Sequence, residues 1–270
     1  MSVMIQASRM LNENNTGGFD MKKLFLFLLC IVVIIFSISA VVRLVSKPDT
    51  DIPKIDIPNK DTNEHTNIVA EKFIEVPAIC QYPELPTGCE SVAATMVLQY
   101  YGVDISPGEF VLSWLEYSED FYTSNGNLYG PDPNKVFAGN PFTNNSYGCF
   151  ATPIVNAVNR NSRDCTAQKI TNRSLEELCS EYIDNDKPLL IWATMSMRES
   201  SAGKSWYLED GSVFTWTAHE HCLVLVGYND NYYFLNDPMS GSTVAYQKNI
   251  VEKRFKELGK QAIYISPNEM

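Results

Sequence analysis

The segment from Gln81 to Gly102 constrains the fold most, because a Pro86-Thr87-Gly88 turn leads directly into Cys89 and then into a helical pattern. Residues 90–101 (ESVAATMVLQYY) place apolar side chains at near-helical spacing, and Gly102 is a suitable C-terminal stop. The pattern predicts a helix over residues 90–101 that begins immediately after the cysteine.

Helix-like segments precede strand-like segments in the rest of the folded region. Further helices are predicted at residues 152–159 and 175–183, the second with Ser174 as its N-cap. Residues 120–149 are rich in Asn, Gly, Pro and aromatic residues and predict a long ordered loop. The predicted strands are residues 73–79, 188–194, 222–228, 232–236 and 262–265. This order is typical of an α+β fold.

Cys89 is a candidate nucleophile. A thiol in the first turn of a helix meets unpaired backbone N–H groups and the positive end of the helix dipole, and both favour the thiolate. Gly88 allows a substrate to approach closely. The alternative is a small buried core residue, because free cysteines are often buried.

The His219-Glu220-His221 sequence offers a base for this thiol. His221 precedes the apolar run 222–226 and is the candidate base, whereas His219 falls in a predicted loop. The alternatives are a surface pair and two metal ligands, but the only other histidine, His65, lies in the polar segment before the folded region. No metal site is therefore predicted.

Asp237 is the candidate group that orients the base. A hairpin turn at residues 227–231 would return the strand 232–236 beside the preceding one and bring Asp237 close to His221. A carboxylate there would accept the Nδ1–H of the imidazole and fix its tautomer. The alternative is a turn-forming aspartate before a proline.

Gln81 is a candidate oxyanion donor, acting through its side-chain amide together with the backbone N–H of Cys89. Its alternative is a surface glutamine at a strand end. The remaining acidic residues near these motifs are interpreted as solvated or capping charges: Glu84, Glu90, Glu220 and Asp230. Trp192, Trp206 and Trp216 are interpreted as packing residues. No P-loop, G-x-G-x-x-G or G-x-S-x-G motif occurs, and no cofactor is predicted.

Charge and cysteine usage narrow the class of protein. The formal net charge is -11 and no basic run occurs in the folded region, which argues against a nucleic-acid partner. The seven cysteines form no C-x-x-C pair and match no zinc spacing. The sequence allows disulfides among Cys80, Cys149, Cys165, Cys179 and Cys222 but does not assign their pairing.

An uncharged apolar run at residues 24–42 is long enough to cross a bilayer, and Lys22-Lys23 before it favour a cytoplasmic N-terminus. We therefore expect a cytoplasmic segment at 1–21, a transmembrane signal anchor at 22–45, a flexible linker at 46–70 and a folded domain at 71–270. Cleavage of the signal segment and translation from Met21 are the alternatives. The expected location is the plasma membrane, with the folded domain outside the cell.

Taken together, the motifs resemble the peptidase C39-like family of papain-like cysteine peptidases. The resemblance spans residues 73–265. Its carriers are Val76-Pro77 leading to Gln81, and residues 84–91 (ELPTGCES), 100–102 (YYG), 147–151 (YGCFA), 221–228 (HCLVLVGY) and 236–238 (NDP). It implies a papain-like fold in which the nucleophile helix packs on an antiparallel sheet. It also implies Cys89 as nucleophile, His221 as base, Asp237 as its orienting group and Gln81 in the oxyanion hole.

The resemblance has one clear limit. The best-known branch of the family is fused to a peptide exporter and trims leader peptides, but this sequence carries no transporter segments and no ATP-binding loop. We expect a membrane-anchored extracellular cysteine peptidase with a peptide or protein substrate and a thioester intermediate. The alternatives are a peptidoglycan peptide hydrolase or amidase, and a catalytically inactive surface binding module.

Overall fold

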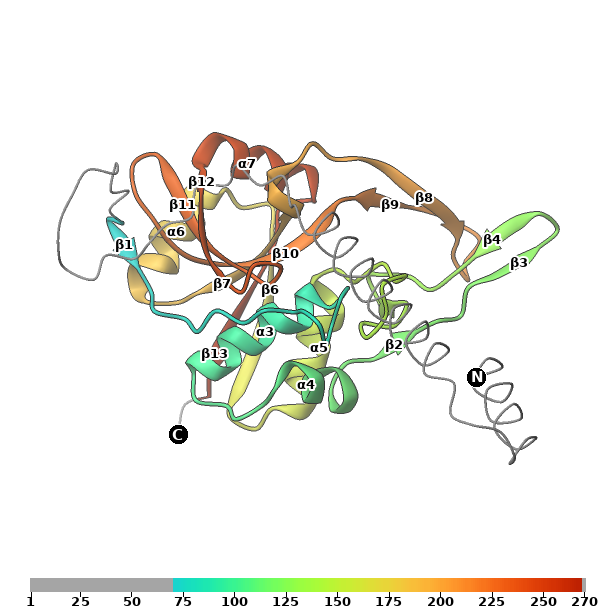
Figure 1. Cartoon of the computed structure of the whole chain (residues 1–270), viewed down its shortest axis with the longest axis horizontal. Coiled ribbons are helices and arrows are strands. Elements are labelled where there is room, and N and C mark those ends of the chain that lie inside the picture. The colour runs from blue at the N-terminus through green and yellow to red at the C-terminus, as the bar shows by residue number, and fades with distance from the viewer. Residues whose placement is uncertain (1–69, 269–270) are drawn as a thin grey trace, which may run out of the picture. The chain divides into compact units, whose positions relative to one another are not determined.

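The computed structural model describes residues 70–268, which form an α+β domain around one antiparallel sheet (Figure 1). The sheet has the strand order β12-β11-β10-β7-β13-β6, and β1 pairs with the end of β10. Its strands are β1 (Lys72–Phe73), β6 (Cys165–Thr171), β7 (Leu189–Thr194), β10 (Glu220–Tyr228), β11 (Tyr232–Asp237), β12 (Ser242–Gln247) and β13 (Gln261–Pro267). The predicted α+β class with an antiparallel sheet is confirmed.

Helices cover this sheet on both sides. Helix α3 lies against β10 and β7, α5 lies against β6 and β13, and α7 contacts β7, β11 and β12 from the side where Figure 1 draws it above the sheet. The helices are α3 (Cys89–Tyr100), α4 (Pro107–Ser113), α5 (Ala151–Asn161), α6 (Leu175–Glu181) and α7 (Lys248–Glu257). Every residue of β7 is buried, as expected for a strand covered on both faces.

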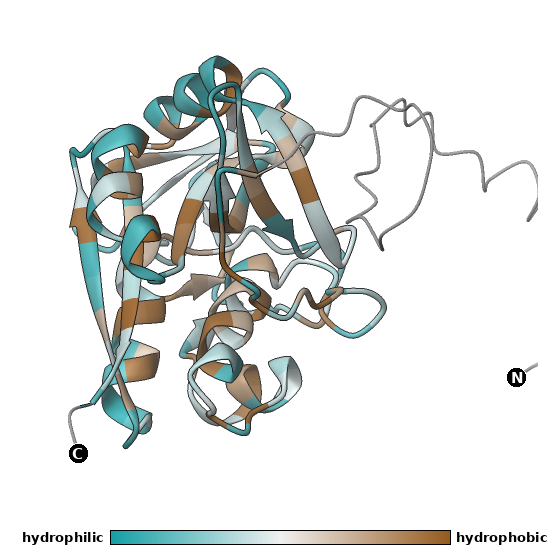
Figure 2. Ribbon diagram, turned by 90° about the vertical axis from the view of Figure 1, so that its left-hand side faces the viewer, coloured by the Kyte–Doolittle hydropathy of each residue, from teal (hydrophilic) through white to brown (hydrophobic). Residues whose placement is uncertain are grey.

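Helix α3 runs through the middle of the domain. All residues from Cys89 to Leu98 are buried, so this helix has no solvated face over its first ten residues. Figure 2 shows apolar residues concentrated on the inner parts of the sheet and helices, with polar residues along the outer surfaces. Complete burial of a side chain such as Met96 or Leu98 contributes roughly 1.5–3 kcal/mol. The core therefore fixes the position of Cys89.

A second, smaller sheet extends away from the main one. It contains β3 (Tyr122–Ser124), β4 (Asn127–Tyr129), β8 (Ser201–Tyr207) and β9 (Val213–Ala218), in the order β3-β4-β8-β9. Figure 1 shows the long strands β8 and β9 leaving the body of the domain toward the β3–β4 hairpin. A two-stranded pair joins β2 (Tyr117–Ser118) to β5 (Phe137–Ala138). Strand β9 leads into β10 through His219, which has a positive φ of 65°.

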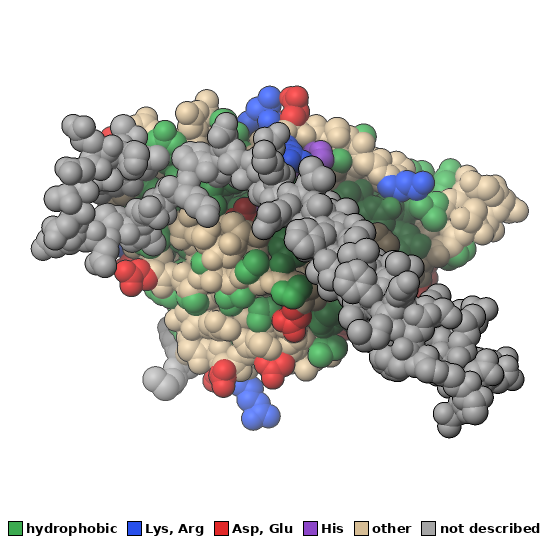
Figure 3. All heavy atoms as spheres, in the orientation of Figure 1, with side chains coloured by type: hydrophobic (Ala, Val, Ile, Leu, Met, Phe, Trp, Pro, Cys, Tyr) green, Lys and Arg blue, Asp and Glu red, His purple; other side chains and the backbone are tan. Residues whose placement is uncertain are grey.

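Charged side chains lie on the surface of the domain (Figure 3), and two of its helices begin with capping boxes. On the face drawn in Figure 3, acidic and basic side chains lie near the edges, and hydrophobic side chains gather between them. Helices α4 and α6 begin with capping boxes, Ser106 with Glu109 and Ser174 with Glu177. Such reciprocal hydrogen bonds satisfy the first N–H groups of a helix. The predicted N-cap at Ser174 is confirmed.

Most of the predicted helices and strands are confirmed, with their ends shifted by a few residues. The predicted strand at residues 73–79 is wrong, because only Lys72–Phe73 pairs with β10. The chain leaves the sheet after Ile74 donates to Val226, and Pro77 has no N–H with which to continue a ladder. Residues 120–149, predicted as a loop, contain strands β3, β4 and β5. Sequence patterns did not predict α4, α7, β6, β8, β9 or β12.

The predicted N-terminal segments 1–21 and 22–45, and the linker 46–70 apart from Ala70, lie outside the described residues. Across residues 70–268, no helix has the length and apolar character that a membrane span requires. The transmembrane anchor therefore stays a prediction from the sequence.

Candidate active site

Cys89 is the first residue of α3, and Gly88 is its N-cap. The preceding turn is closed by hydrogen bonds from the Leu85 N–H to the Gln81 carbonyl at 2.7 Å and from the Gly88 N–H to the Leu85 carbonyl at 3.0 Å. A Cβ on Gly88 would lie 2.9 Å from the Leu85 Cβ, so the turn requires glycine there. The first N–H groups of a helix lack intrahelical acceptors, and Cys89 is positioned among them.

His221 and Asp237 form a buried hydrogen-bonded pair. Their Nε2 and Oδ1 atoms lie 2.7 Å apart, and the same Oδ1 accepts the Met239 N–H at 2.8 Å. Strands β10 and β11 pair with Val224 opposite Asn236, which brings the two side chains together as the predicted hairpin required. The side chains are 1% and 7% exposed, so water does not compete with this bond.

The nitrogen that bonds to the carboxylate differs from the prediction. Asp237 lies beyond the far edge of the His221 ring, and Nε2, the nitrogen remote from the backbone, reaches it instead of Nδ1. The Nδ1 atom is buried and has no hydrogen-bond partner among the described residues. Burial alone would raise the pKa of Asp237, but the hydrogen bond from His221, the charge of His221 and the Met239 N–H hold it below its usual value.

The thiol of Cys89 does not hydrogen-bond to His221 within residues 70–268; its Sγ lies 3.4 Å from the Glu90 Oε2. Burial raises the pKa of Cys89 well above its ordinary value, and the charges of Glu90 and Glu220 raise it further. Only the backbone N–H of Cys222 acts in the opposite direction. The expectation that the helix N-terminus would favour the thiolate is therefore outweighed by burial and by two neighbouring acids.

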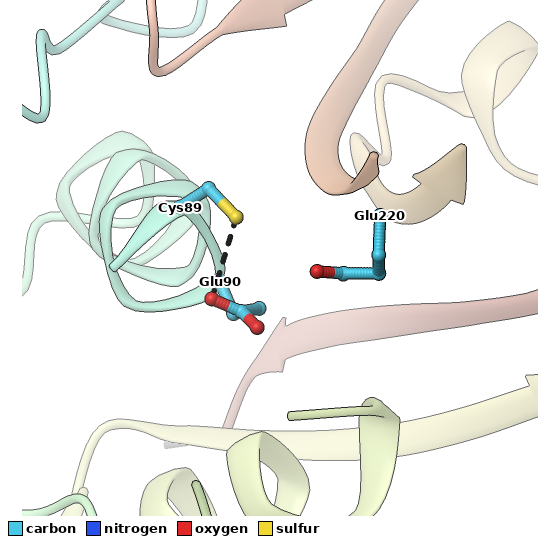
Figure 4. Close-up of side chains that lie close together, drawn as sticks. All are labelled: Cys89, Glu90 and Glu220. Atoms are coloured by element: carbon cyan, nitrogen blue, oxygen red, sulfur yellow. Dashed lines mark hydrogen bonds between the residues drawn. The ribbon is translucent and has the colours of Figure 1, made fainter. Parts of the chain in front are cut away.

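Glu90 and Glu220 are not solvated charges, contrary to the prediction; they are 0% and 3% exposed. Figure 4 shows their carboxyl groups pointing toward each other from α3 and β10, with the Cys89 sulfur beside them. The Glu90 Oε1 accepts the Cys149 N–H at 2.6 Å. Burial raises the pKa of Glu90 to about 7, although hydrogen bonds from Cys149 and Cys89 oppose the shift. Burial and the Glu90 charge raise the pKa of Glu220 well above its usual value.

Gln81 is buried beside the turn that precedes Cys89. Its backbone N–H donates to the Pro238 carbonyl at 2.8 Å, and its Nε2 donates to the Pro86 carbonyl at 2.7 Å. These two bonds connect the turn before Cys89 to the turn after Asp237. An amide nitrogen carries two hydrogens, so Nε2 keeps one for a further acceptor.

Tyr82 is a site residue that the sequence did not single out. Burial raises its pKa, and the charges of Cys89, Cys80 and Asp237 raise it further. Tyr82 is 46% exposed, whereas Cys89 and Asp237 are buried. Its position next to Gln81 was the only feature of the sequence that could have indicated Tyr82.

One group of three possible metal donors occurs in the described part of the chain: Cys89, Glu90 and Glu220, with donor atoms within 4.8 Å of one another. The Glu90 Oε1 is already bonded to the Cys149 N–H, and its Oε2 contacts the Cys89 sulfur. These contacts and the raised carboxyl pKa values are those expected when the Cys89 thiol and the two carboxyl groups hold protons in place of a metal ion. We therefore assign no metal to it, and the absence of a metal site stays a prediction. All six cysteines between residues 70 and 268 are free thiols.

The family model of the peptidase C39 like family matches residues 73–263, and the chain belongs to this family. The chain is similar to the uncharacterized protein YvpB of Bacillus subtilis (strain 168), with 24% identity over 249 residues, which cover 88% of this chain and 97% of that protein. It is also similar to a crystal structure from Bacillus anthracis assigned to the C39-like peptidases. That match has 26% identity, a TM-score of 0.64 and coverage of 74% of this chain and all of the other. Membership of the family suggests a cysteine peptidase.

Proposed function

We propose that the protein is a membrane-anchored extracellular cysteine peptidase that hydrolyses peptide bonds with Cys89, His221 and Asp237. The observation that carries the proposal is the buried His221–Asp237 hydrogen bond of 2.7 Å, made from neighbouring strands, in a chain of the C39-like family. The carboxylate occupies Nε2, so Nδ1 is the ring nitrogen that is available to exchange a proton with the thiol.

The reaction follows from these groups. Nδ1 of His221 accepts the Cys89 proton, and the thiolate attacks the carbonyl carbon of the scissile peptide bond. The imidazolium then protonates the leaving amine, the C–N bond breaks and a thioester remains on Cys89. Water, deprotonated by His221, hydrolyses this thioester and restores the thiol. Asp237 keeps the ring oriented and stabilises its positive charge in both half-reactions.

The negative charge of the tetrahedral intermediate needs hydrogen-bond donors. Two candidates are the backbone N–H of Cys89, at the start of α3, and the second hydrogen of the Gln81 Nε2. Donors that are fixed in place before the reaction stabilise the oxyanion without reorganisation. Two contacts support this role: the Pro86 carbonyl holds the side-chain amide of Gln81, and the Pro238 carbonyl holds its backbone N–H.

The membrane anchor and the extracellular location rest on the sequence. The uncharged run 24–42 and the preceding Lys22-Lys23 support them. The test is protease protection: in intact cells, an external protease should digest the domain 71–270 and leave the N-terminal segment inside. Recovery of the domain in the culture medium would indicate cleavage of the signal segment instead.

The peptidase activity is tested with the full chain and a mixture of peptides from a denatured protein, by mass spectrometry of newly formed α-amino groups. We expect cleavage by the wild type and none by Cys89→Ala. Cys80→Ala is the matched control, because Cys80 is also a free thiol but is exposed; it should retain activity. Equal cleavage by the wild type and Cys89→Ala, or no cleavage at all, would contradict the proposal.

A further inference from the structure

Two buried acids adjoin the proposed nucleophile, and the proposed mechanism does not use them. Donor atoms of Cys89, Glu90 and Glu220 lie within 4.8 Å of one another. Neither glutamate forms a salt bridge anywhere in residues 70–268, and the Glu220 Oε1 is buried without a hydrogen-bond partner there. Burying an unpaired carboxylate is costly, so such a group takes up a proton or pairs with a cation.

The chain makes room for these carboxyl groups. A Cβ on Gly148 would lie 2.4 Å from the Glu90 Oε1 and 3.3 Å from the Glu220 Oε2. The φ of Gly148 is +146°, a conformation that L side chains rarely adopt. The next residue, Cys149, donates its backbone N–H to Glu90 at 2.6 Å. Gly148 therefore leaves the space that the Glu90 carboxyl group occupies, and Cys149 supplies its N–H donor.

We propose that Glu90 is a catalytic residue, whose protonated carboxyl group donates a hydrogen bond from Oε2 to the Cys89 thiolate, with Glu220 as its neutral partner. The contact that carries this inference is the 3.4 Å distance between Sγ and Oε2. The inference rests on the proposed function, because it assumes Cys89 as the nucleophile.

The proton on Glu90 determines how much negative charge the site holds when Cys89 is a thiolate. With Glu90 ionised, a thiolate on Cys89 would place two negative charges 3.4 Å apart in a buried site. With Glu90 protonated, the same contact becomes an O–H···S⁻ hydrogen bond, which is strong because the acceptor is charged. Burial raises the pKa of Glu220 well above its usual value, and this favours the neutral carboxyl group. At most one negative charge then resides on the pair.

Other groups that titrate also face this cluster. From β10, His221 and Cys222 are close, and the charge of His221 lowers the pKa of Glu90. From the segment before α5, Cys149 contributes a thiol whose pKa burial raises. Burial and the charge of Cys89 raise the pKa of Tyr82, which is also a titrating group near the cluster. The pKa of Glu90, at about 7, lies within the range where a peptidase would operate.

The inference predicts a distinctive pH profile for alkylation of Cys89 by iodoacetamide. This reaction forms an Sγ–C bond and releases iodide, and the thiol proton passes through Nδ1 of His221 to solvent. The reactive species has a Cys89 thiolate and a protonated Glu90. Below about pH 7 it forms by loss of one proton, so the alkylation rate should rise about tenfold per pH unit. Above about pH 7 most molecules have lost one proton, from Glu90. The species with a Cys89 thiolate and a protonated Glu90 differs from this form only in the position of the remaining proton. Its population therefore stays constant, and the alkylation rate reaches a plateau.

The experiment measures this rate from pH 5 to 9.5 in the full chain, in the wild type and in Glu90→Gln. Digestion of the quenched samples at Glu84 separates Cys89 from Cys80, and the exposed Cys80 is the internal reference. A glutamine is always neutral and can donate to sulfur, so the variant should match the wild type below pH 6 and keep rising above pH 7. We expect an excess over the wild type of about tenfold at pH 8 and about 100-fold at pH 9.

Two further variants decide how the result is interpreted. Glu75→Gln removes an exposed charge and should reproduce the wild-type plateau. Glu220→Gln mimics the neutral partner and should also keep the plateau near pH 7. An unchanged profile in Glu90→Gln, a slower rate in that variant at every pH, or loss of the plateau only in Glu220→Gln would each overturn the inference. Alkylation needs no substrate, so these outcomes are independent of whether peptide cleavage is detected.

Discussion

Replacing Glu90 with glutamine should remove a large part of the pH dependence of stability. The pKa of Glu90 is raised from 4.5 in an exposed carboxyl group to about 7 in the folded domain, mainly by burial. Between these two values the folded state holds a proton that the unfolded state releases. The free energy of unfolding of the wild type therefore falls as pH rises through this window, and the loss is complete above pH 7.

The size of the effect follows from the same shift. A rise from 4.5 to about 7, at roughly 1.4 kcal/mol per pKa unit, corresponds to about 3 kcal/mol of stability lost between pH 4.5 and pH 8. A glutamine cannot ionise, so Glu90→Gln should lack this contribution. The amide keeps an oxygen for the Cys149 N–H and an N–H₂ group for the Cys89 sulfur.

The assay is urea unfolding of the wild type and Glu90→Gln at pH 4.5 and 8, monitored by fluorescence of the buried Trp192 and Trp206. The difference between the two pH values should be smaller in the variant by about 3 kcal/mol. Glu75→Gln, at an exposed position, controls for the loss of one charge. The same pH dependence in all three proteins would refute the burial and protonation of Glu90.

The other predictions concern the proposed catalytic groups and the space that Gly148 leaves for the Glu90 carboxyl group. Gln81→Ala should lower kcat for peptide cleavage on the order of 100-fold through loss of one oxyanion donor, and unchanged kcat would exclude that role. Asp237→Asn should lower kcat by about 10⁴-fold, because an amide in this position favours the wrong tautomer of His221; a loss under tenfold in steady-state assays would argue against the pair. Gly148→Ala should destabilise the domain by roughly 1–3 kcal/mol in urea unfolding, because its Cβ would clash with Glu90. Wild-type stability of that variant would show that the pair needs no such space.

The sequence was sufficient to predict α3 and the His221–Asp237 pair because both depend on local patterns. An apolar run after a Pro-Thr-Gly turn specifies the helix that begins at Cys89. The hairpin between β10 and β11 has a short turn, and a short turn fixes which residues of the two strands face each other. The prediction that Asp237 bonds to Nδ1 was wrong, because the bonded nitrogen depends on the direction in which the imidazole ring points, and Nε2 reaches Asp237.

The roles of Glu90 and Glu220 could not be read in the same way. An acid in the first turn of a helix is favoured by the helix dipole even when it is exposed, so Glu90 gave no signal of burial. Burial of both acids results from packing of α3 against β10, two elements far apart in the chain. The adjacent Gly148-Cys149 pair, noted only as part of a family-like motif, supplies the space and the N–H donor for Glu90.

The strands of the smaller sheet were missed for a related reason. Residues 201–207 (SAGKSWY) of β8 are mostly exposed, so they lack the alternation of polar and apolar side chains that marks a half-buried strand. Their pairing with β9 is determined by the neighbouring strand and not by a pattern of their own.

The central claim, that Cys89 and His221 act as one unit, is tested most directly by the rate of Cys89 alkylation at pH 6, where Glu90 would be protonated. The rate is compared in the wild type, in His221→Ala and in His219→Asn, with Cys80 as the reference thiol. His219 is exposed and has a positive φ that asparagine tolerates, so its replacement is a matched control. We expect a loss on the order of 100-fold in His221→Ala and no change in His219→Asn. Equal rates in the wild type and His221→Ala would contradict it.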